Sequence, residues 1–319
     1  MMPLFDSEPD DLEDLGLRAR SDDAGVRRVA MLALAETAEP EAAELLIAGL
    51  TDPAAEVRAA AAQALEEHAG PAVVGALVAV LDDPDAKVRE AAAAALAERH
   101  EPDTAPLLIA RAGHGSAFAR AAAFRALREL AAPGAAGVAL DALADPCPVV
   151  RREAVAVLGW LRTAAAQPGL MQTAYDPEPE VRRATMTALV SVASGAPGAE
   201  ALIAGLRDTD WRVREEAAAT IARNKLPEAE TALIRGMGDP VWQVRLKSAA
   251  ALGRLGAIAA LPALAVALAS EVSNLRKEAA AALGEIADPA ALPALRAVAA
   301  DPDPDVRKTA LWAIGRCGG

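Results

Sequence analysis

Ten arginines recur along this chain at a nearly constant interval, and this recurrence limits the possible folds more than any other feature. The interval is 31 residues, with one interval of 32. A fixed period of about 20 to 50 residues is typical of a repeat array, in which each unit packs against its neighbours. The arginines are Arg27, Arg58, Arg89, Arg120, Arg151, Arg182, Arg214, Arg245, Arg276 and Arg307.

A longer motif surrounds each arginine and reads Asp-Pro-x-x-x-Val-Arg-x-x-Ala-Ala-x-Ala-Leu, most completely at residues 52–65 and 83–96. Val57, Ala61 and Leu65 follow one another at intervals of four residues, which places them on one face of a helix. The motif therefore predicts an α-helix in every unit and excludes a β-propeller.

The Asp-Pro pair predicts where that helix begins. An aspartate oxygen can accept the free amide hydrogens of a first turn, and proline fits the first helical position. Seven of the ten units carry the aspartate, while Ser21 and Ser270 replace it in two others. The fourth unit, with His114 between two glycines, is the irregular one.

A second, shorter helix is expected before each Asp-Pro turn. Prolines at 40, 71, 102, 133 and 289 share one register and mark its first turn. The chain opens with such a helix at about residues 9–19. We therefore expect an all-α fold, a right-handed α-solenoid of about ten two-helix repeats, with one domain over 9–316 and an acidic tail at 1–8.

The motif resembles the HEAT-repeat superfamily, and specifically its bacterial subgroup named after the phycobilisome lyases. The resemblance covers residues 9–316. It implies that the Asp-Pro helix is the second of each pair and lines the concave face. It also implies that the aspartates and arginines bond between repeats, so that Arg58 reaches an aspartate or a carbonyl of an adjacent unit.

Charge divides unevenly between the two halves of the chain. Residues 1–160 contain 27 acidic and 14 basic residues, while residues 161–319 contain 18 of each, so the first half carries the whole net charge of −13. Part of the imbalance is ordered, because the ninth residue after the arginine (the +9 column) is glutamate in the first four units. The column reads Glu36, Glu67, Glu98, Glu129, Trp160, Ser191, Arg223, Arg254, Glu285 and Arg316.

The +9 column points away from the apolar stripe, as do the first and fifth residues after each arginine, so these positions are expected to face solvent on the inner wall. Exposed tryptophans are frequent anchors of protein interfaces. Our candidates for contact with a partner come from these positions. They are Glu36, Glu67, Glu98, Glu129, Arg152, Trp160, Arg183, Lys277 and Trp312.

No set of residues points to catalysis, a metal or a cofactor. His68, His100 and His114 lack the spacing of a zinc site, and Cys147 and Cys317 lie in different units. Phosphate loops, nucleophile elbows and HExxH motifs do not occur. An isoelectric point near 4.8 argues against a nucleic-acid partner.

No uncharged apolar stretch of about 20 residues predicts a membrane span, and no secretory signal is recognisable. We therefore expect a cytoplasmic, non-catalytic scaffold that holds a protein partner on its concave face. The alternative is a bilin-lyase-like subunit that assists attachment of a tetrapyrrole to a partner protein, which the resemblance implies.

Overall fold

The computed structural model describes residues 12–37 and 39–318, and within them the secondary structure is entirely helical. Within each of two compact units, described below, the helices alternate between an inner and an outer layer, because each repeat contributes one helix to each. The inner helices of the first unit are α2 (Ala24–Leu34), α4 (Ala55–Ala64), α6 (Ala86–Ala97), α8 (Ala117–Glu129) and α10 (Pro148–Leu161), and those of the second are α12 (Pro179–Ala188), α14 (Trp211–Asn224), α16 (Trp242–Leu255), α18 (Ser273–Ile286) and α20 (Pro304–Arg316). The outer helices of the first unit are α1 (Leu12–Arg18), α3 (Pro40–Gly49), α5 (Pro71–Ala79), α7 (Ala105–Ala112) and α9 (Ala136–Asp141), and those of the second are α11 (Gln167–Thr173), α13 (Pro197–Gly205), α15 (Glu230–Gly236), α17 (Leu261–Ala267) and α19 (Leu292–Ala297).

Short 3₁₀ turns adjoin many of these helices. They are η1 (Leu65–Glu67), η2 (Val80–Asp82), η3 (Pro102–Thr104), η4 (Pro133–Ala135), η5 (Ala142–Ala144), η6 (Ala164–Ala166), η7 (Pro227–Ala229), η8 (Ile258–Ala260) and η9 (Pro289–Ala291). The prolines at 40, 71, 102, 133 and 289 each begin an outer helix or the 3₁₀ turn that leads into one. This confirms the expected first turn of the shorter helix in each pair.

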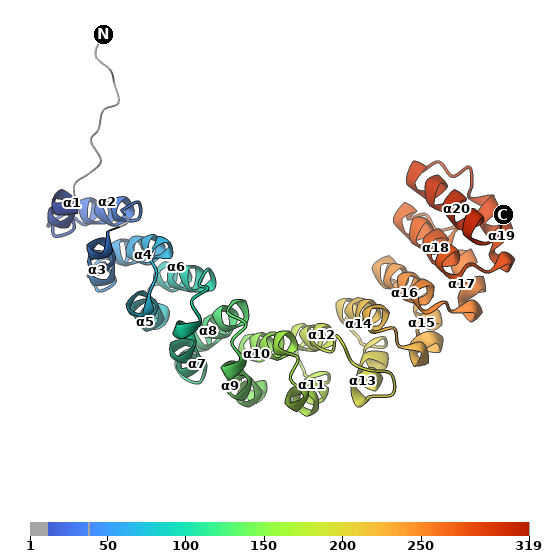
Figure 1. The fold of residues 1–319 in the computed structure, drawn as a ribbon, viewed down its shortest axis with the longest axis horizontal. Helices are drawn as coiled ribbons and strands as arrows, with labels where there is room; N and C mark the ends of the chain where they lie inside the picture. The colour runs from blue at the N-terminus through green and yellow to red at the C-terminus, as the bar shows by residue number, and fades with distance from the viewer. Residues whose placement is uncertain (1–11, 38, 319) are drawn as a thin grey trace, which may run out of the picture. The chain divides into compact units, whose positions relative to one another are not determined.

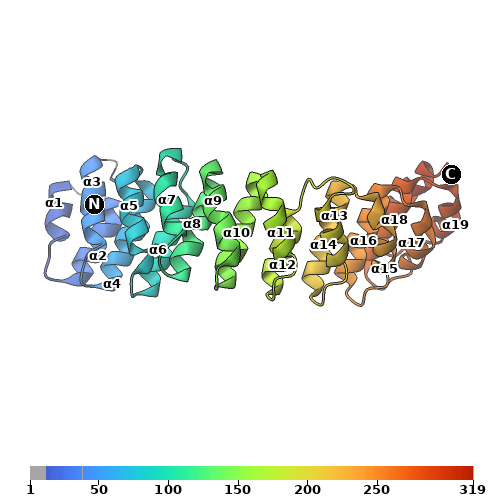
Figure 2. The ribbon, with the colours of Figure 1, turned by 90° about the horizontal axis from the view of Figure 1, so that it is seen from below.

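Contacts divide the chain into two compact units, Met1–Leu161 and Arg162–Gly319, with five helix pairs in each. In unit 1 the inner helices α2, α4, α6, α8 and α10 pack in chain order, and each also packs against the outer helix before it. Figure 1 shows the even-numbered helices on the inner side of this curved row. In Figure 2 the helices of the row stand side by side.

Unit 2 is built in the same way from α11 to α20. Its inner helices α12, α14, α16, α18 and α20 pack in sequence, and each contacts its own outer helix. The all-α solenoid of two-helix repeats is thus confirmed. A single domain over 9–316 stays a prediction, and the expected tail at 1–8 lies outside the described residues.

Small and aliphatic side chains form the core between the layers. Val57, Ala61 and Leu65 are at most 1% exposed, as the periodicity predicted. Alanine lets adjacent helices approach closely but buries little area at each interface, so stability accumulates over successive neighbours. No helix in the described part of the chain is both long and apolar enough to cross a bilayer.

The expected role of the Asp-Pro pair in starting the inner helix was wrong by two to three residues in most repeats. In the second repeat α4 begins at Ala55 after the N-cap Ala54, so Asp52 and Pro53 lie before the helix. An oxygen of Asp52 accepts the N–H of Ala54 in a local turn. The carboxylate is placed there because it also binds an arginine of the preceding repeat.

Candidate protein-binding surfaces

The recurring arginines link successive repeats through paired hydrogen bonds. Arg58 donates from Nε and Nη2 to the two carboxylate oxygens of Asp83 in the next repeat, at 2.7 and 2.8 Å. Its Nη1 donates to the carbonyl of Asp52 in its own turn, at 2.8 Å. Rungs of this kind, with an arginine fork on an aspartate, recur between neighbouring repeats. They are Arg27–Asp52, Arg58–Asp83, Arg120–Asp145, Arg182–Asp208, Arg214–Asp239 and Arg276–Asp301.

These rungs confirm the bonding that the family resemblance implied, and they give the arginines a structural role. The hydrogen bonds from Arg58 hold the pKa of Asp83 below its usual range, although burial opposes the shift. Because their fork is occupied by protein atoms, these arginines are poor candidates for partner contact.

Two rungs are replaced where the motif is irregular. Arg89 faces the fourth repeat, which has His114 in place of the aspartate, and its guanidinium lies 5.6 Å from the centre of the Phe118 ring. This is a cation–π contact. Arg245 faces Ser270, and its Nη1 donates to the carbonyls of Asp239 and Pro240 in its own turn.

A second set of links between repeats was not expected from the sequence. In several repeats the side chain of the tenth residue after the arginine (the +10 column) donates to the carbonyl of a leucine at or near the C-terminus of the preceding inner helix. Its donors are His68 to Leu34, Arg99 to Leu65, Asn224 to Leu189 and Cys317 to Leu283. These bonds tie the C-terminal part of one inner helix to the next repeat, in most cases at a carbonyl that also accepts a backbone N–H, as Leu65 does from His68.

Several inner helices end in a residue with positive φ, whether their own +10 residue is apolar or, as in α14 with Asn224, polar. Gly256 after α16 adopts a left-handed conformation with φ of 64°, and the N–H of Ala257 then bonds the carbonyl of Leu252. The end of an inner helix is therefore satisfied by its own backbone, by the next repeat, or by both, as at Leu283 of α18. The sequence signal for a bond from the next repeat is a polar residue in the +10 column.

The acidic row Glu36, Glu67, Glu98 and Glu129 faces solvent, since all four side chains are exposed. Glu129 forms an ion pair with Arg128 at 2.7 Å, which reduces its effective charge. The other three have no ion pair within 4.0 Å among the residues that the structure describes. The free carboxylates of the row are therefore those at 36, 67 and 98.

The three basic candidates are engaged within the protein. Arg152 binds the buried carboxylate of Glu153 at 2.6 Å. Arg183 lies 3.7 Å from Glu180, and Lys277 lies 2.9 Å from Asp305 in the next repeat. The hydrogen bond and the negative charge of Asp305 raise the pKa of Lys277. These cations are consequently less available to a partner than the sequence suggested.

The two candidate tryptophans are exposed to different extents. Trp160, at the end of α10, is 61% exposed, and Trp312 on α20 is 48% exposed. Trp312 lies against Gly284 of α18, where a Cβ atom would overlap the indole atom Cζ3. Glycine at this position thus permits the ring to rest on the neighbouring helix with its other face open.

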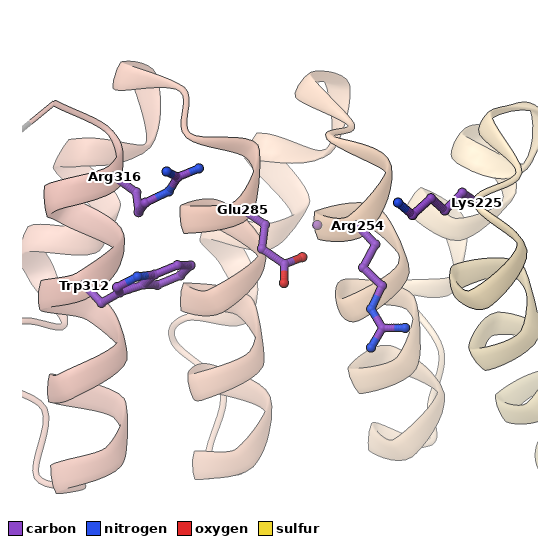
Figure 3. Close-up of a pocket in the computed structure, with 6 residues that line it drawn as sticks. Lys225, Arg254, Glu285, Trp312 and Arg316 are labelled. Atoms are coloured by element: carbon purple, nitrogen blue, oxygen red, sulfur yellow. The ribbon is translucent and has the colours of Figure 1, made fainter.

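A shallow pocket of about 470 Å³ adjoins this indole on the inner layer of unit 2. It is lined by Lys225, Gly253, Arg254, Glu285, Trp312 and Arg316. Figure 3 shows them along four consecutive inner helices, from Trp312 and Arg316 on α20 to Lys225 at the end of α14. Arg254, Glu285 and Arg316 share the +9 column, but the sequence did not single them out as a binding site. Lys225, which completes the pocket, lies outside that column in the turn after α14.

A second pocket of about 330 Å³ shares Arg254 and reaches Lys247 and Glu278. Burial and the negative charge of Glu285 raise the pKa of Glu278, while Lys247 and Arg254 oppose the shift. In residues 12–37 and 39–318 no three His, Cys, Asp or Glu side chains are grouped to hold a metal ion.

Comparison with known proteins supports the repeat architecture. The sequence model described as HEAT repeats matches residues 12–97, 74–138, 136–199, 199–280 and 262–319. Curated proteins give no match to the sequence.

Among solved structures, an engineered protein is 23% identical, with a TM-score of 0.59 and coverage of 96% of this chain and 98% of its own. YibA from E. coli is 19% identical, with a TM-score of 0.58 and coverage of 94% and 99%. The karyopherin Kap121p bound to Ste12p is 18% identical, with a TM-score of 0.66, over 100% of this chain but only 42% of its own length. At these identities the likeness is one of fold.

Proposed function

Since the chain belongs to the HEAT-repeat family, we propose that it is a non-catalytic scaffold that binds a protein partner through its inner layer of helices. The observation that carries this proposal is the set of large and charged side chains on that layer without partners in the protein. Glu36, Glu67 and Glu98 supply free carboxylates in unit 1, while Trp160 and Trp312 supply exposed aromatic surface. Such groups commonly set the orientation and strength of binding.

The structural neighbours are compatible with this role. Kap121p was solved bound to Ste12p, to Nup53p and to the extreme C-terminus of Cdc14p, each a protein or a segment of one. A protein partner also suits a chain with a net charge of −13 better than a nucleic acid does. A cytoplasmic location remains part of the proposal.

The test reverses the acidic row by replacing Glu36, Glu67, Glu98 and Glu129 with lysine. Capture of the partner from a lysate of the source organism, identified by mass spectrometry, should fall roughly tenfold at low salt, because the favourable potential is inverted. Raising the salt should shrink the difference, since charges on the surface are screened.

The control makes the same charge change on the outer side of unit 1. Four exposed acidic residues there suit it, namely Glu41, Glu44, Asp103 and Asp141. Their replacement with lysine should leave capture nearly unchanged. Equal losses for the two variants, or no specific capture by the unaltered protein, would refute an inner-layer scaffold.

The phycobilisome-lyase-type motif around residues 52–65 and 83–96 supports a second candidate, a subunit that assists attachment of a tetrapyrrole to a partner. Addition of a bilin or heme should then change the visible absorbance of the protein. An unchanged spectrum combined with specific capture of a protein would favour the scaffold.

A further inference from the structure

The pocket at the end of the inner layer of unit 2 is positively charged in an acidic protein. Lys225, Arg254 and Arg316 contribute three cations and Glu285 one carboxylate to its lining. The chain as a whole carries a net charge of −13. A local excess of positive charge attracts a negatively charged group.

These cations are unpaired among the described residues. Lys225, Arg254 and Arg316 make no ion pair within 4.0 Å and no side-chain hydrogen bond, whereas Arg223 is held by Glu216 at 2.6 Å. Positive charge near a helix C-terminus interacts favourably with the helix dipole. That effect accounts for cations at these helix ends, but it does not account for the aromatic platform beside them.

Trp312 provides that platform. Its ring rests on α18 at Gly284, so one face is fixed by protein and the side chain remains 48% exposed. In Figure 3 the indole extends from α20 toward Glu285, with Arg316 one turn above it on the same helix. An immobilised aromatic face of this kind favours stacking with a ring on a partner, because little conformational freedom is lost on contact.

We propose that this pocket binds an extended acidic segment of the protein partner, which stacks an aromatic side chain on Trp312 and places carboxylates against Arg316, Arg254 and Lys225. The assignment rests on the proposed scaffold function and specifies the chemistry that one of its surfaces recognises. Charge complementarity selects the acidic character, and the indole selects the aromatic residue.

The helix spacing sets the spacing of the segment. Packed helices lie about 8–10 Å apart, so two intervals separate α20 from α16 by roughly 16–20 Å. An extended chain advances about 3.3 Å per residue, so the segment needs roughly five or six residues to cross. One carboxylate directly after the aromatic residue meets Arg316, and a second acidic pair reaches Arg254, toward whose helix the side chain of Lys225 extends from the end of α14 (Figure 3).

A small inorganic anion could contact the cations but would leave the indole of Trp312 without a contact. A polynucleotide would follow a longer path over unit 2, which contains 18 acidic and 18 basic residues and therefore carries no net positive charge to neutralise phosphates. A short acidic segment with one ring uses both the cations and the platform.

The experiment titrates the full-length protein into a fluorescein-labelled peptide, Gly-Ser-Phe-Asp-Gly-Ser-Gly-Asp-Glu, and follows anisotropy at low salt. Replacing Arg254 and Arg316 together with glutamine should weaken binding at least tenfold, and Trp312→Ala should weaken it by a similar factor. Glu285→Gln should strengthen binding several-fold, because it removes the carboxylate that repels the peptide. This opposite sign is not expected from a loss of folding.

Arg235→Gln with Arg296→Gln is the matched control, since both arginines are exposed on the outer helices α15 and α19. That variant should bind the peptide like the unaltered protein. A peptide with alanine for phenylalanine should bind more weakly to the unaltered protein but equally to Trp312→Ala.

Several outcomes would overturn the assignment. They are an absence of peptide binding, equal effects of the inner and outer substitutions, and equally tight binding of inorganic phosphate or of a single-stranded oligonucleotide. A concentration-dependent dimer abolished by the Arg254 and Arg316 substitutions would identify a second copy as the occupant instead. Continued partner capture with no peptide binding would reject this pocket and leave the scaffold function standing.

Discussion

Replacing Ser270 with aspartate should stabilise unit 2, because it supplies the carboxylate that the fork of Arg245 lacks. The preceding rung shows the geometry to be restored. Arg214 donates to the two oxygens of Asp239 at 2.7 and 3.0 Å, and the same carboxylate accepts the N–H of Val241 at 2.9 Å. Ser270 supplies only the equivalent local bond, from the N–H of Val272 at 3.2 Å.

The expected gain is about 1 kcal/mol. Two unit charges about 4 Å apart attract by about 4 kcal/mol at an effective dielectric constant near 20, but removing the new carboxylate from water cancels most of this. Exposed pairs retain roughly 0.2–1 kcal/mol. The Arg214 and Asp239 side chains are only 13% and 9% exposed and meet in a bidentate geometry, which favours the upper end of that range.

Urea denaturation followed by circular dichroism measures the change, together with a thermal melt. A gain of this size raises the melting temperature by about 2–4 °C for a unit of this length. The double-mutant cycle adds Arg245→Gln to both backgrounds, and the coupling energy isolates the new ion pair. The reasoning is refuted if Ser270→Asp stabilises the Arg245→Gln protein just as much, or stabilises neither.

Acid should weaken the same ladder of arginine–aspartate pairs, because hydrogen bonds from Arg58 lower the pKa of Asp83. The contribution of Asp83 to the free energy of unfolding is complete above the unfolded aspartate pKa of about 4. It is lost as the pH falls through the lowered pKa of the folded state. Thermal melts from about pH 6 down to pH 2 test this, and a smaller acid loss is expected for Asp83→Asn; equal losses would contradict it. Arg99→Leu should cost about 2 kcal/mol, because the buried carbonyls of Leu65 and His68 lose the hydrogen bonds that Arg99 donates to them. Urea denaturation should show a smaller loss for Arg99→Lys, which keeps a donor, and a neutral Arg99→Leu would contradict the role of the +10 column.

The sequence by itself determined the repeat, the helix pair and the inter-repeat bond. A period of 31 residues and the apolar spacing within it leave stacked helix pairs as the way to bury each unit's apolar face. The arginine and aspartate recur in the same register, so neighbouring copies of the motif bring them together. Exposure of the acidic row followed from the helical period for the same reason.

Only the tertiary structure decided which charged side chains remain free. Arg152, Arg183 and Lys277 occupy solvent-facing positions in the motif, yet each reaches a carboxylate nearby. Such pairings depend on side-chain reach across the helix and between repeats, which a one-dimensional period does not encode. Lys225 enters the basic pocket because the left-handed turn after α14 places it there.

The position of the Asp-Pro turn has the same explanation. Propensity placed Asp52 at the helix start, where an aspartate can cap. Its carboxylate instead bonds Arg27 of the preceding repeat, and α4 begins at Ala55. Local sequence fixes which elements form, because their periodicity is local, whereas the partners of each polar atom depend on the neighbouring repeat against which it packs.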